Sequence, residues 1–263
     1  MKIQKSTLAL ILLILFIIGI IPISPVIDNN NPKFISNQIF PSQSVQFNVS
    51  ENISNKVAII LPHPDDETIG MGGMIQKLES EGKEVHCVLL ASGNGITDKV
   101  PLCNNYYGLN ISQNASAAEK KKIIREDSFK RVMSIYNCSY EIIGVDDGTV
   151  TNETAYKVME KLYNEGYGEF YTVTGDYTPD HLSCHNAMKS MLEKYPKLKY
   201  RQFPIYFHSS SKYVPMPIVN KYTDYDVKEY LPKKLEAFEV YYNIGIFKRG
   251  FYKTEVERIY YIN

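Results

Sequence analysis

A histidine and three acidic residues stand together in the segment Leu61-Pro-His-Pro-Asp-Asp-Glu67. The apolar run Val57-Ala-Ile-Ile60 before it predicts a buried strand, and Gly70-Met-Gly-Gly73 after it opens a predicted helix. The segment is therefore a strand-to-helix loop, the place where α/β sheets bind their ligands. Zinc accepts imidazole and carboxylate as ligands, and a second carboxylate is then left to act as a base. The competing interpretation is a solvated acidic loop that caps a helix.

Two histidines stand four residues apart in a second segment, Thr174-Gly-Asp-Tyr-Thr-Pro-Asp-His-Leu-Ser-Cys-His185. This segment follows a predicted strand at 169–174, and Asp180-His181 begins a predicted helix. Histidines at this spacing lie on one face of a helix, where they commonly hold a metal, although the spacing also arises by chance. Both segments thus stand at the carboxyl end of a strand.

Strand and helix patterns alternate along the rest of the chain and must position these two segments. Strands are predicted at 57–60, 84–91, 141–145, 169–174 and 199–208, with a final Tyr-rich strand within 251–262, and helices at 74–81, 115–136, 151–165, 180–194 and 227–243. A loop rich in Ser and Pro is predicted at 209–222. Because strands joined by helices pair in parallel, we expect an α/β fold, a Rossmann-like three-layer sandwich with a mainly parallel sheet.

The first segment resembles the signature of a known family. Pro62-His-Pro-Asp-Asp-Glu67, followed by Gly72-Gly73, is similar to the motif of the LmbE-like/PIG-L family of zinc-dependent N-deacetylases. These enzymes remove acetyl groups from N-acetylglucosamine-type sugars. The resemblance implies that His63 and Asp66 bind Zn²⁺ and that Asp65 is the general base.

The family has a similar His-Pro-Asp-His element at the second segment, which implies that His181 is the third zinc ligand. Three protein ligands leave a fourth position for water, as is typical of catalytic zinc. This chain has Thr178 where some members use a histidine to stabilise the oxyanion, so Tyr177 and His185 are candidates to assist there. Asp180 is predicted to orient a neighbouring group or to cap the helix.

Three further residues are candidates for contact with the metal ligands or the substrate. Glu67 completes the acidic run of the first segment. Arg125 lies on a predicted helix that resembles the Arg/Glu-bearing helix of the family, and a solvated charged face is the equal alternative. Asp147 precedes a glycine, so it either forms a turn or hydrogen-bonds the substrate.

The composition fits one α/β domain with an appendage. The chain has 263 residues and is 44% hydrophobic, which is enough for a sizeable core. Lys+Arg and Asp+Glu both total 29, so charge gives no argument for a nucleic-acid partner. The expected activity is hydrolysis of the acetyl amide of an N-acetylated sugar or glycolipid. The alternative is a membrane-tethered carbohydrate-binding protein that has lost turnover, an idea motivated by Thr178 and the 21 tyrosines.

Residues 1–27 are predicted to be a signal anchor or a cleaved signal peptide, because two lysines precede a nearly unbroken apolar run. A polar linker is predicted at 28–54 and the deacetylase domain at 55–263. By the positive-inside rule the domain lies outside the cytoplasm, attached to the membrane, or is secreted if the peptide is cleaved. There Cys103 and Cys138 are candidates to form a disulfide. Six Asn-x-Ser/Thr sequons support this placement and begin at Asn48, Asn52, Asn110, Asn114, Asn137 and Asn152.

Overall fold

The computed structural model describes residues 54–95, 108–205, 214–246 and 254–262, along which strands alternate with helices. In chain order the elements are β1 (Lys56–Leu61), α2 (Asp66–Ser80), β2 (Glu84–Ala91), α3 (Ala117–Tyr136), β3 (Ser139–Val145), α4 (Asn152–Asn164), β4 (Glu169–Val173), α5 (Pro179–Lys194), β5 (Lys199–Phe203), β6 (Tyr222–Asp226), the 3-10 helix η2 (Lys228–Tyr230), α6 (Leu231–Asn243) and β7 (Val256–Tyr261).

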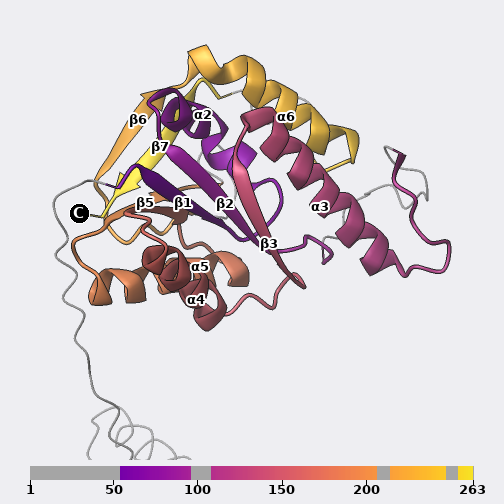
Figure 1. Cartoon of the computed structure of the whole chain (residues 1–263), viewed down its shortest axis with the longest axis horizontal. Coiled ribbons are helices and arrows are strands. Elements are labelled where there is room, and N and C mark those ends of the chain that lie inside the picture. Colours follow the sequence, from indigo (N-terminus) through magenta and orange to yellow (C-terminus); the bar gives the residue numbers. More distant parts are fainter. Residues whose placement is uncertain (1–53, 96–107, 206–213, 247–253, 263) are drawn as a thin grey trace, which may run out of the picture. The chain divides into compact units, whose positions relative to one another are not determined.

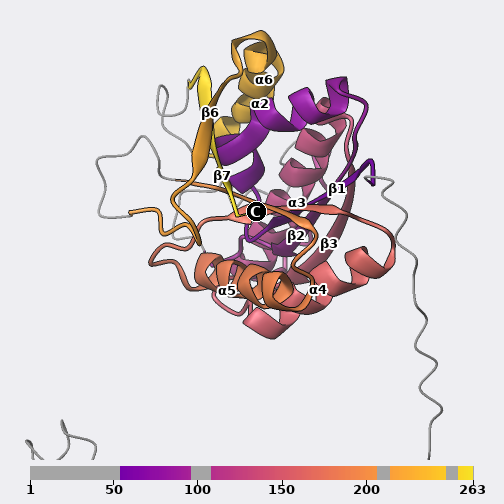
Figure 2. The same cartoon turned by 90° about the vertical axis from the view of Figure 1, so that its left-hand side faces the viewer.

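The strands form one seven-stranded sheet in the order β3-β2-β1-β4-β5-β7-β6. The strands from β3 to β5 pair in parallel, whereas β7 and β6 are antiparallel to their neighbours. Helices α2, α3 and α6 cover one face of the sheet, and α4 and α5 cover the other (Figure 1 and Figure 2). The predicted α/β fold with a mainly parallel sheet is therefore confirmed.

Strand β1 lies where the chain changes direction across the sheet. β2 and β3 are added on one side of it, whereas β4 and β5 are added on the other. Open α/β sheets bind their ligands at such a switch point, beyond the carboxyl ends of its two strands. The two segments with candidate chemistry follow β1 and β4, so the topology brings them to the same place.

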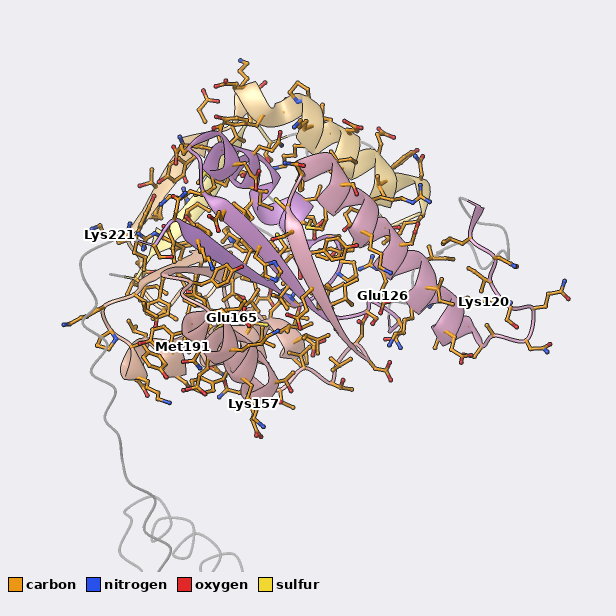
Figure 3. All side chains as sticks on the ribbon, in the orientation of Figure 1. Lys120, Glu126, Lys157, Glu165, Met191 and Lys221 are labelled. Carbon is orange, nitrogen blue, oxygen red and sulfur yellow. The ribbon has the colours of Figure 1, made fainter. Side chains whose placement is uncertain are left out.

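The central strands are apolar because helices cover both of their faces. Residues 57–61 of β1 and 87–91 of β2 are fully buried. The covering helices instead have one buried face. Figure 3 shows Lys157 of α4 at the outer surface and Met191 of α5 beneath the sheet, where Met191 is fully buried.

Helix α2 begins at Asp66, earlier than predicted. The prediction was wrong because the glycines that were taken to open the helix lie inside it, where neighbours approach too closely for a side chain. A Cβ on Gly73 would lie 2.4 Å from the Cβ of Val227. The acidic side chains of Asp66 and Glu67 favour the observed start, because the amino end of a helix attracts negative charge. The helix is kinked at Met71, whose φ of −154° is not helical.

The carboxyl-terminal part differs from the prediction in three ways. Strand β6 was not predicted, because its residues are mostly exposed and form no apolar pattern. It forms by pairing with β7 at the sheet edge. Helix α6 begins at Leu231, with a proline in its first turn, rather than at residue 227. Strand β5 ends at Phe203, before a proline that cannot donate a ladder hydrogen bond. The end of the predicted strand, 206–208, lies outside the described residues.

The predicted signal anchor at 1–27 and Cys103 lie outside the described residues, as does the predicted linker except residue 54. Within the part of the chain that the structure describes, no helix is both long and apolar enough to cross a membrane. The anchor, the linker and the disulfide therefore stay predictions.

Candidate metal centre and catalytic site

Three potential ligand atoms meet beyond the carboxyl ends of β1 and β4, one each from His63, Asp66 and His181, and all lie within 4.8 Å of one another. Asp66 Oδ2 is 3.5 Å from His63 Nδ1 and 3.6 Å from His181 Nε2. A tetrahedral zinc ion with bonds of about 2.0–2.2 Å separates its ligand atoms by roughly 3.3–3.6 Å. The donor types and these two spacings therefore fit zinc.

Each of the two histidines also has its second ring nitrogen next to a buried carboxylate. His63 Nε2 lies 3.0 Å from Asp180 Oδ2, and His181 Nδ1 lies 2.7 Å from Asp176 Oδ2. Both carboxylates are themselves held by backbone N–H groups. Histidines that bind metals commonly have such a carboxylate behind them, because it fixes the tautomer and the orientation of the ring.

The centre favours positive charge on its rings. Burial alone would lower the pKa of His63, but hydrogen bonds with Asp180 and Asp66 raise it to about 10. Burial would likewise lower the pKa of His181, but the charge of Asp66 and the hydrogen bond with Asp176 raise it to about 9. Burial would raise the pKa of Asp66, but the two histidines hold it well below its usual range. Protons and a divalent cation therefore compete for the same donor atoms.

Asp65 lies between two of these residues in the sequence but does not belong to the donor set. Its φ of 122° is a left-handed backbone conformation, which costs a non-glycine residue on the order of 1–3 kcal/mol. Burial raises the pKa of the Asp65 carboxyl, Arg125 opposes the rise, and the resulting value is about 7. A carboxyl group with this pKa can both accept and return a proton near neutral pH.

Arg125 of α3 is fully buried beside Asp65. Its Nη2 donates to the carbonyl of Pro64 at 2.6 Å, and its Nη1 lies 3.6 Å from Asp65 Oδ2. Among the described residues, Arg125 Nε and Nη1 are the buried side-chain nitrogen or oxygen atoms without a hydrogen-bond partner. Gly93 makes room for the guanidinium, because a Cβ there would lie 2.4 Å from Arg125 Nε. This burial excludes a solvated helix face for Arg125.

Glu67 is fully buried in the first turn of α2. Its Oε2 accepts a hydrogen bond from the backbone N–H of Asp65 at 3.1 Å. Its Oε1 accepts from Thr68 Oγ1 at 2.9 Å and from the hydroxyl of Tyr241 at 2.7 Å. Burial raises the pKa of the Glu67 carboxyl. Glu67 therefore contacts the backbone of Asp65 and lies outside the metal donor set.

The three candidates for a role at the oxyanion occupy different environments. Thr178 is the N-cap of α5, and its side chain makes no capping hydrogen bond. Tyr177 is 72% exposed. His185 is buried and its Nδ1 accepts a hydrogen bond from the backbone N–H of Gly175 at 3.1 Å. Burial lowers the pKa of His185 to about 4, so it is a neutral acceptor that lies apart from the donor set although it is one turn from His181.

Asp147 lies in a turn after β3 and reaches the neighbouring glycine turn after β2. Its carboxylate accepts hydrogen bonds from the backbone N–H groups of Gly93 at 2.7 Å and Gly95 at 3.0 Å. Asp147 therefore fixes the turn that packs against Arg125.

Two residues around this site were not predicted. Asp176 stands five residues before His181, and its place in the same loop is a usable signal, because a zinc-binding histidine commonly has a carboxylate behind it. Tyr241 contacts Glu67 from α6, and no local pattern marks it because the two residues are 174 positions apart.

Comparisons with known proteins place both segments of the site in one family. The model of the PIG-L family, described as GlcNAc-PI de-N-acetylase, matches residues 58–192. A diacetylchitobiose deacetylase from Thermococcus kodakarensis is 46% identical over 57 residues, which are 20% of this chain and 21% of that protein. The match thus spans about a fifth of the length of this curated relative.

Similar solved structures include two deacetylases and a hydratase. The N,N'-diacetylchitobiose deacetylase from Pyrococcus horikoshii, in complex with its inhibitor MPG, has a TM-score of 0.54 at 19% identity, covering 74% of this chain and 72% of its own. A triple mutant of a deacetylase of teicoplanin biosynthesis has a TM-score of 0.59 at 13% identity, covering 78% and 97%. The 4-carboxy-2-hydroxymuconate hydratase from Pseudomonas putida KT2440 has a TM-score of 0.56 at 16% identity, covering 79% and 96%.

At these identities the structural likeness shows a shared fold, and the hydratase shows that this fold also serves other reactions. The family model gives the stronger result, because it matches about half of the chain and includes all three residues of the donor set. This protein therefore belongs to the PIG-L family.

Proposed function

We propose that this protein is a zinc-dependent N-deacetylase that hydrolyses the N-acetyl group of an N-acetylglucosamine-type sugar. The observation that carries the proposal is the buried carboxylate of Asp65, which interacts electrostatically with Asp66 and His63 without belonging to the three-atom donor set. A metal centre with a separate base is what metal-assisted amide hydrolysis needs. Family membership and the similarity to a diacetylchitobiose deacetylase support an N-acetylated sugar as the substrate.

His63, Asp66 and His181 would hold the zinc ion, which when bound activates a water molecule and polarises the amide carbonyl. Asp180 and Asp176 orient the two rings, so that His63 Nδ1 and His181 Nε2 both face Asp66 Oδ2. The donor set is thus held from behind before any ligand binds, which is the usual requirement for an active metal centre.

Asp65 moves the proton in this proposal. Its carboxylate takes a proton from water, and the water oxygen forms a bond to the carbonyl carbon of the N-acetyl group. The carbon–nitrogen bond of the tetrahedral intermediate then breaks, and Asp65 returns the proton to the leaving nitrogen, which gives the free amine and acetic acid, and the acid ionises to acetate. Burial favours the protonated carboxyl and the guanidinium of Arg125 beside it favours the carboxylate, so these two opposing effects support a group that both takes and returns a proton.

Metal analysis combined with acetate release from the full chain tests the proposal. We expect about one zinc ion per chain and release of acetate from N-acetylglucosamine, diacetylchitobiose or an N-acetylglucosamine glycolipid. Zinc with sugar binding but without acetate release would instead favour the alternative, a carbohydrate-binding protein that has lost turnover. A chain that binds no metal would contradict the three-residue donor set.

We also propose that residues 1–27 attach the protein to a membrane with residues 55–263 outside the cytoplasm, so that a cell-surface glycan or glycolipid is the substrate. The lysines before the apolar run support this orientation, and all four sequon asparagines within the described residues are exposed. Protease treatment of intact cells that express the chain should digest the domain. A domain that resists protease until the cells are lysed would contradict the orientation.

A further inference from the structure

Buried charges hold the peptide bond between Pro64 and Asp65 from both sides. Its carbonyl oxygen accepts a hydrogen bond from Arg125 Nη2 at 2.6 Å, and its N–H donates to Glu67 Oε2 at 3.1 Å. Both charged side chains are fully buried. Two charge-assisted hydrogen bonds on opposite edges of one planar unit fix its rotation, and this rotation sets the left-handed φ of Asp65.

The direction of the Asp65 carboxylate depends on this peptide. Because φ describes the rotation about the bond from the Asp65 nitrogen to its Cα, turning the peptide plane swings the side chain relative to His63 and Asp66. A base has to be held within about 0.5 Å of its productive position for efficient proton transfer. The hydrogen bonds of the peptide with Arg125 and Glu67 therefore control the distance between the Asp65 carboxylate and the donor set, on which the proposed reaction depends.

Tyr241 of α6 in turn holds the carboxylate of Glu67. Its hydroxyl donates to Glu67 Oε1 at 2.7 Å, and Thr68 Oγ1 donates to the same oxygen at 2.9 Å. Tyr241 and Glu67 are both fully buried. Since the other carboxylate oxygen accepts from the Asp65 N–H, the two donors on Oε1 fix the rotation of the whole carboxylate group.

A simpler explanation is that Glu67 stabilises the amino end of α2, where negative charge is favourable. That effect requires only a charge in the first turn, and an exposed carboxylate would supply it without the cost of burial. It does not account for a buried hydroxyl that reaches Glu67 from a helix 174 residues further along the chain. The burial and the two side-chain donors instead indicate that the orientation of the carboxylate matters.

We propose that Tyr241 is a positioning residue of the active site, which orients the Pro64–Asp65 peptide through Glu67 and thereby directs the base Asp65. The inference rests on the proposed deacetylase function. It gives α6, which lies beyond the residues 58–192 matched by the family model, a part in the reaction.

Tyr241→Phe in the full chain removes the hydroxyl donor and tests this role. We expect kcat for acetate release to fall about tenfold, while KM and zinc content stay within about twofold of the wild type. Thr68→Val removes the second donor and should lower kcat by a smaller factor. Tyr200→Phe is the matched control, because buried Tyr200 donates to the carbonyls of Met191 and Tyr195 away from the site, and its kcat should not change.

Three results would overturn the inference in an active protein. They are a kcat of Tyr241→Phe near that of the wild type, an equal fall of kcat in Tyr200→Phe, and a loss of zinc that accounts for the fall. If Tyr241→Phe does not fold, an unchanged kcat in Thr68→Val overturns it. A wild-type protein that releases no acetate from any sugar contradicts the proposed function itself, and the inference with it.

Discussion

The two segments that build the candidate site reach it by different backbone routes. The first, residues 61–67, leaves β1 and turns sharply into α2, with Asp65 in a left-handed conformation. The second, residues 174–185, enters α5 in the ordinary way, with Thr178 extended at the N-cap and a proline in the first turn. The first segment carries the proposed base and two donor residues, whereas the second contributes His181.

The two segments are also supported differently. Buried charges of Arg125 from α3 and Asp180 from α5 hold the first segment, together with the carboxylate of its own Glu67. The second is held by Asp176 behind its histidine and by the neutral ring of His185 on its backbone. Backbone strain persists only where the surroundings enforce it. The difference indicates that this fold concentrates buried charge around the residue proposed to move a proton, and leaves the ligand of the second segment to regular helix geometry.

The largest effect should follow from a change in the first segment. Asp65→Asn keeps the size of the side chain but removes the proton acceptor, so we expect kcat to fall by roughly 10²–10⁴-fold. Zinc content and melting temperature should stay at wild-type values, because Asp65 is not in the donor set. Loss of zinc, or a fall of kcat by less than tenfold, would contradict the proposal that the base and the zinc ligands are separate residues.

A change in the second segment should affect metal binding rather than rate. Asp176→Asn removes the charge behind His181, so zinc affinity should fall about 10–100-fold while kcat at saturating zinc changes little. Competition with a chelator measures the affinity. Asp180→Asn is the matched variant, because Asp180 belongs to α5 but supports His63 of the first segment. A large loss of kcat in Asp176→Asn at saturating zinc would contradict the proposal that the second segment affects metal binding rather than rate.

Residues that are close in the sequence could be predicted from it. His63, Asp65 and Asp66 share one loop after an apolar strand, so residue type and spacing were sufficient to select them. The second segment could be selected because it follows a second strand, and parallel strands bring their carboxyl ends to one edge of the sheet. The choice of His181 rather than His185 within it came from the family resemblance. The buried strands β1 and β2 could also be predicted, because their burial is indicated by the apolar composition of a short stretch of sequence.

Contacts between distant parts of the chain could not be predicted in this way. Tyr241 meets Glu67 across 174 positions, and a tyrosine on a helix has no mark that shows its partner. For Arg125 the sequence left a site residue and a solvated helix face as equal alternatives, because only the packing of α3 over the glycine turn shows that it is buried. The glycines inside α2 suggested a helix start, since glycine is a poor helix former, and Val227 against Gly73 explains them only in three dimensions.

A smaller effect is expected from His185, which tests whether a neutral group supports the second segment. Its pKa of about 4, against 6.5 in the unfolded chain, means that between these values the unfolded state binds a proton that the folded state does not. The contribution of His185 to the free energy of unfolding is therefore fully present above about pH 7.5 and decreases as the pH falls, by about 2 kcal/mol between pH 7.5 and 5.

Urea unfolding of the wild type and of His185→Asn at several pH values measures this difference. Asparagine keeps an acceptor for the N–H of Gly175 but does not titrate, so the free energy of unfolding of the variant should fall by about 2 kcal/mol less over the same range. Equal pH dependence in the two proteins would show that His185 protonates without cost to the fold, and that the second segment does not depend on a neutral ring.

The smallest effect should come from the distant support of the first segment. Asp147→Ala removes the acceptor of the Gly93 and Gly95 N–H groups, in the turn that packs against Arg125. Because Gly95 is exposed and its N–H can bind water instead, we expect a loss of about 1 kcal/mol in the free energy of unfolding. The guanidinium should shift slightly with the turn, so kcat should fall about threefold.

Asp146→Ala is the control. Asp146 is exposed and accepts from the side chain of Asn94, so its removal leaves the N–H groups of Gly93 and Gly95 bonded to Asp147. An equal fall of kcat in both variants would show that only α2, α3 and α6 help to position Asp65. A fall of kcat in Asp147→Ala alone would show that the turn after β2 helps to position it as well.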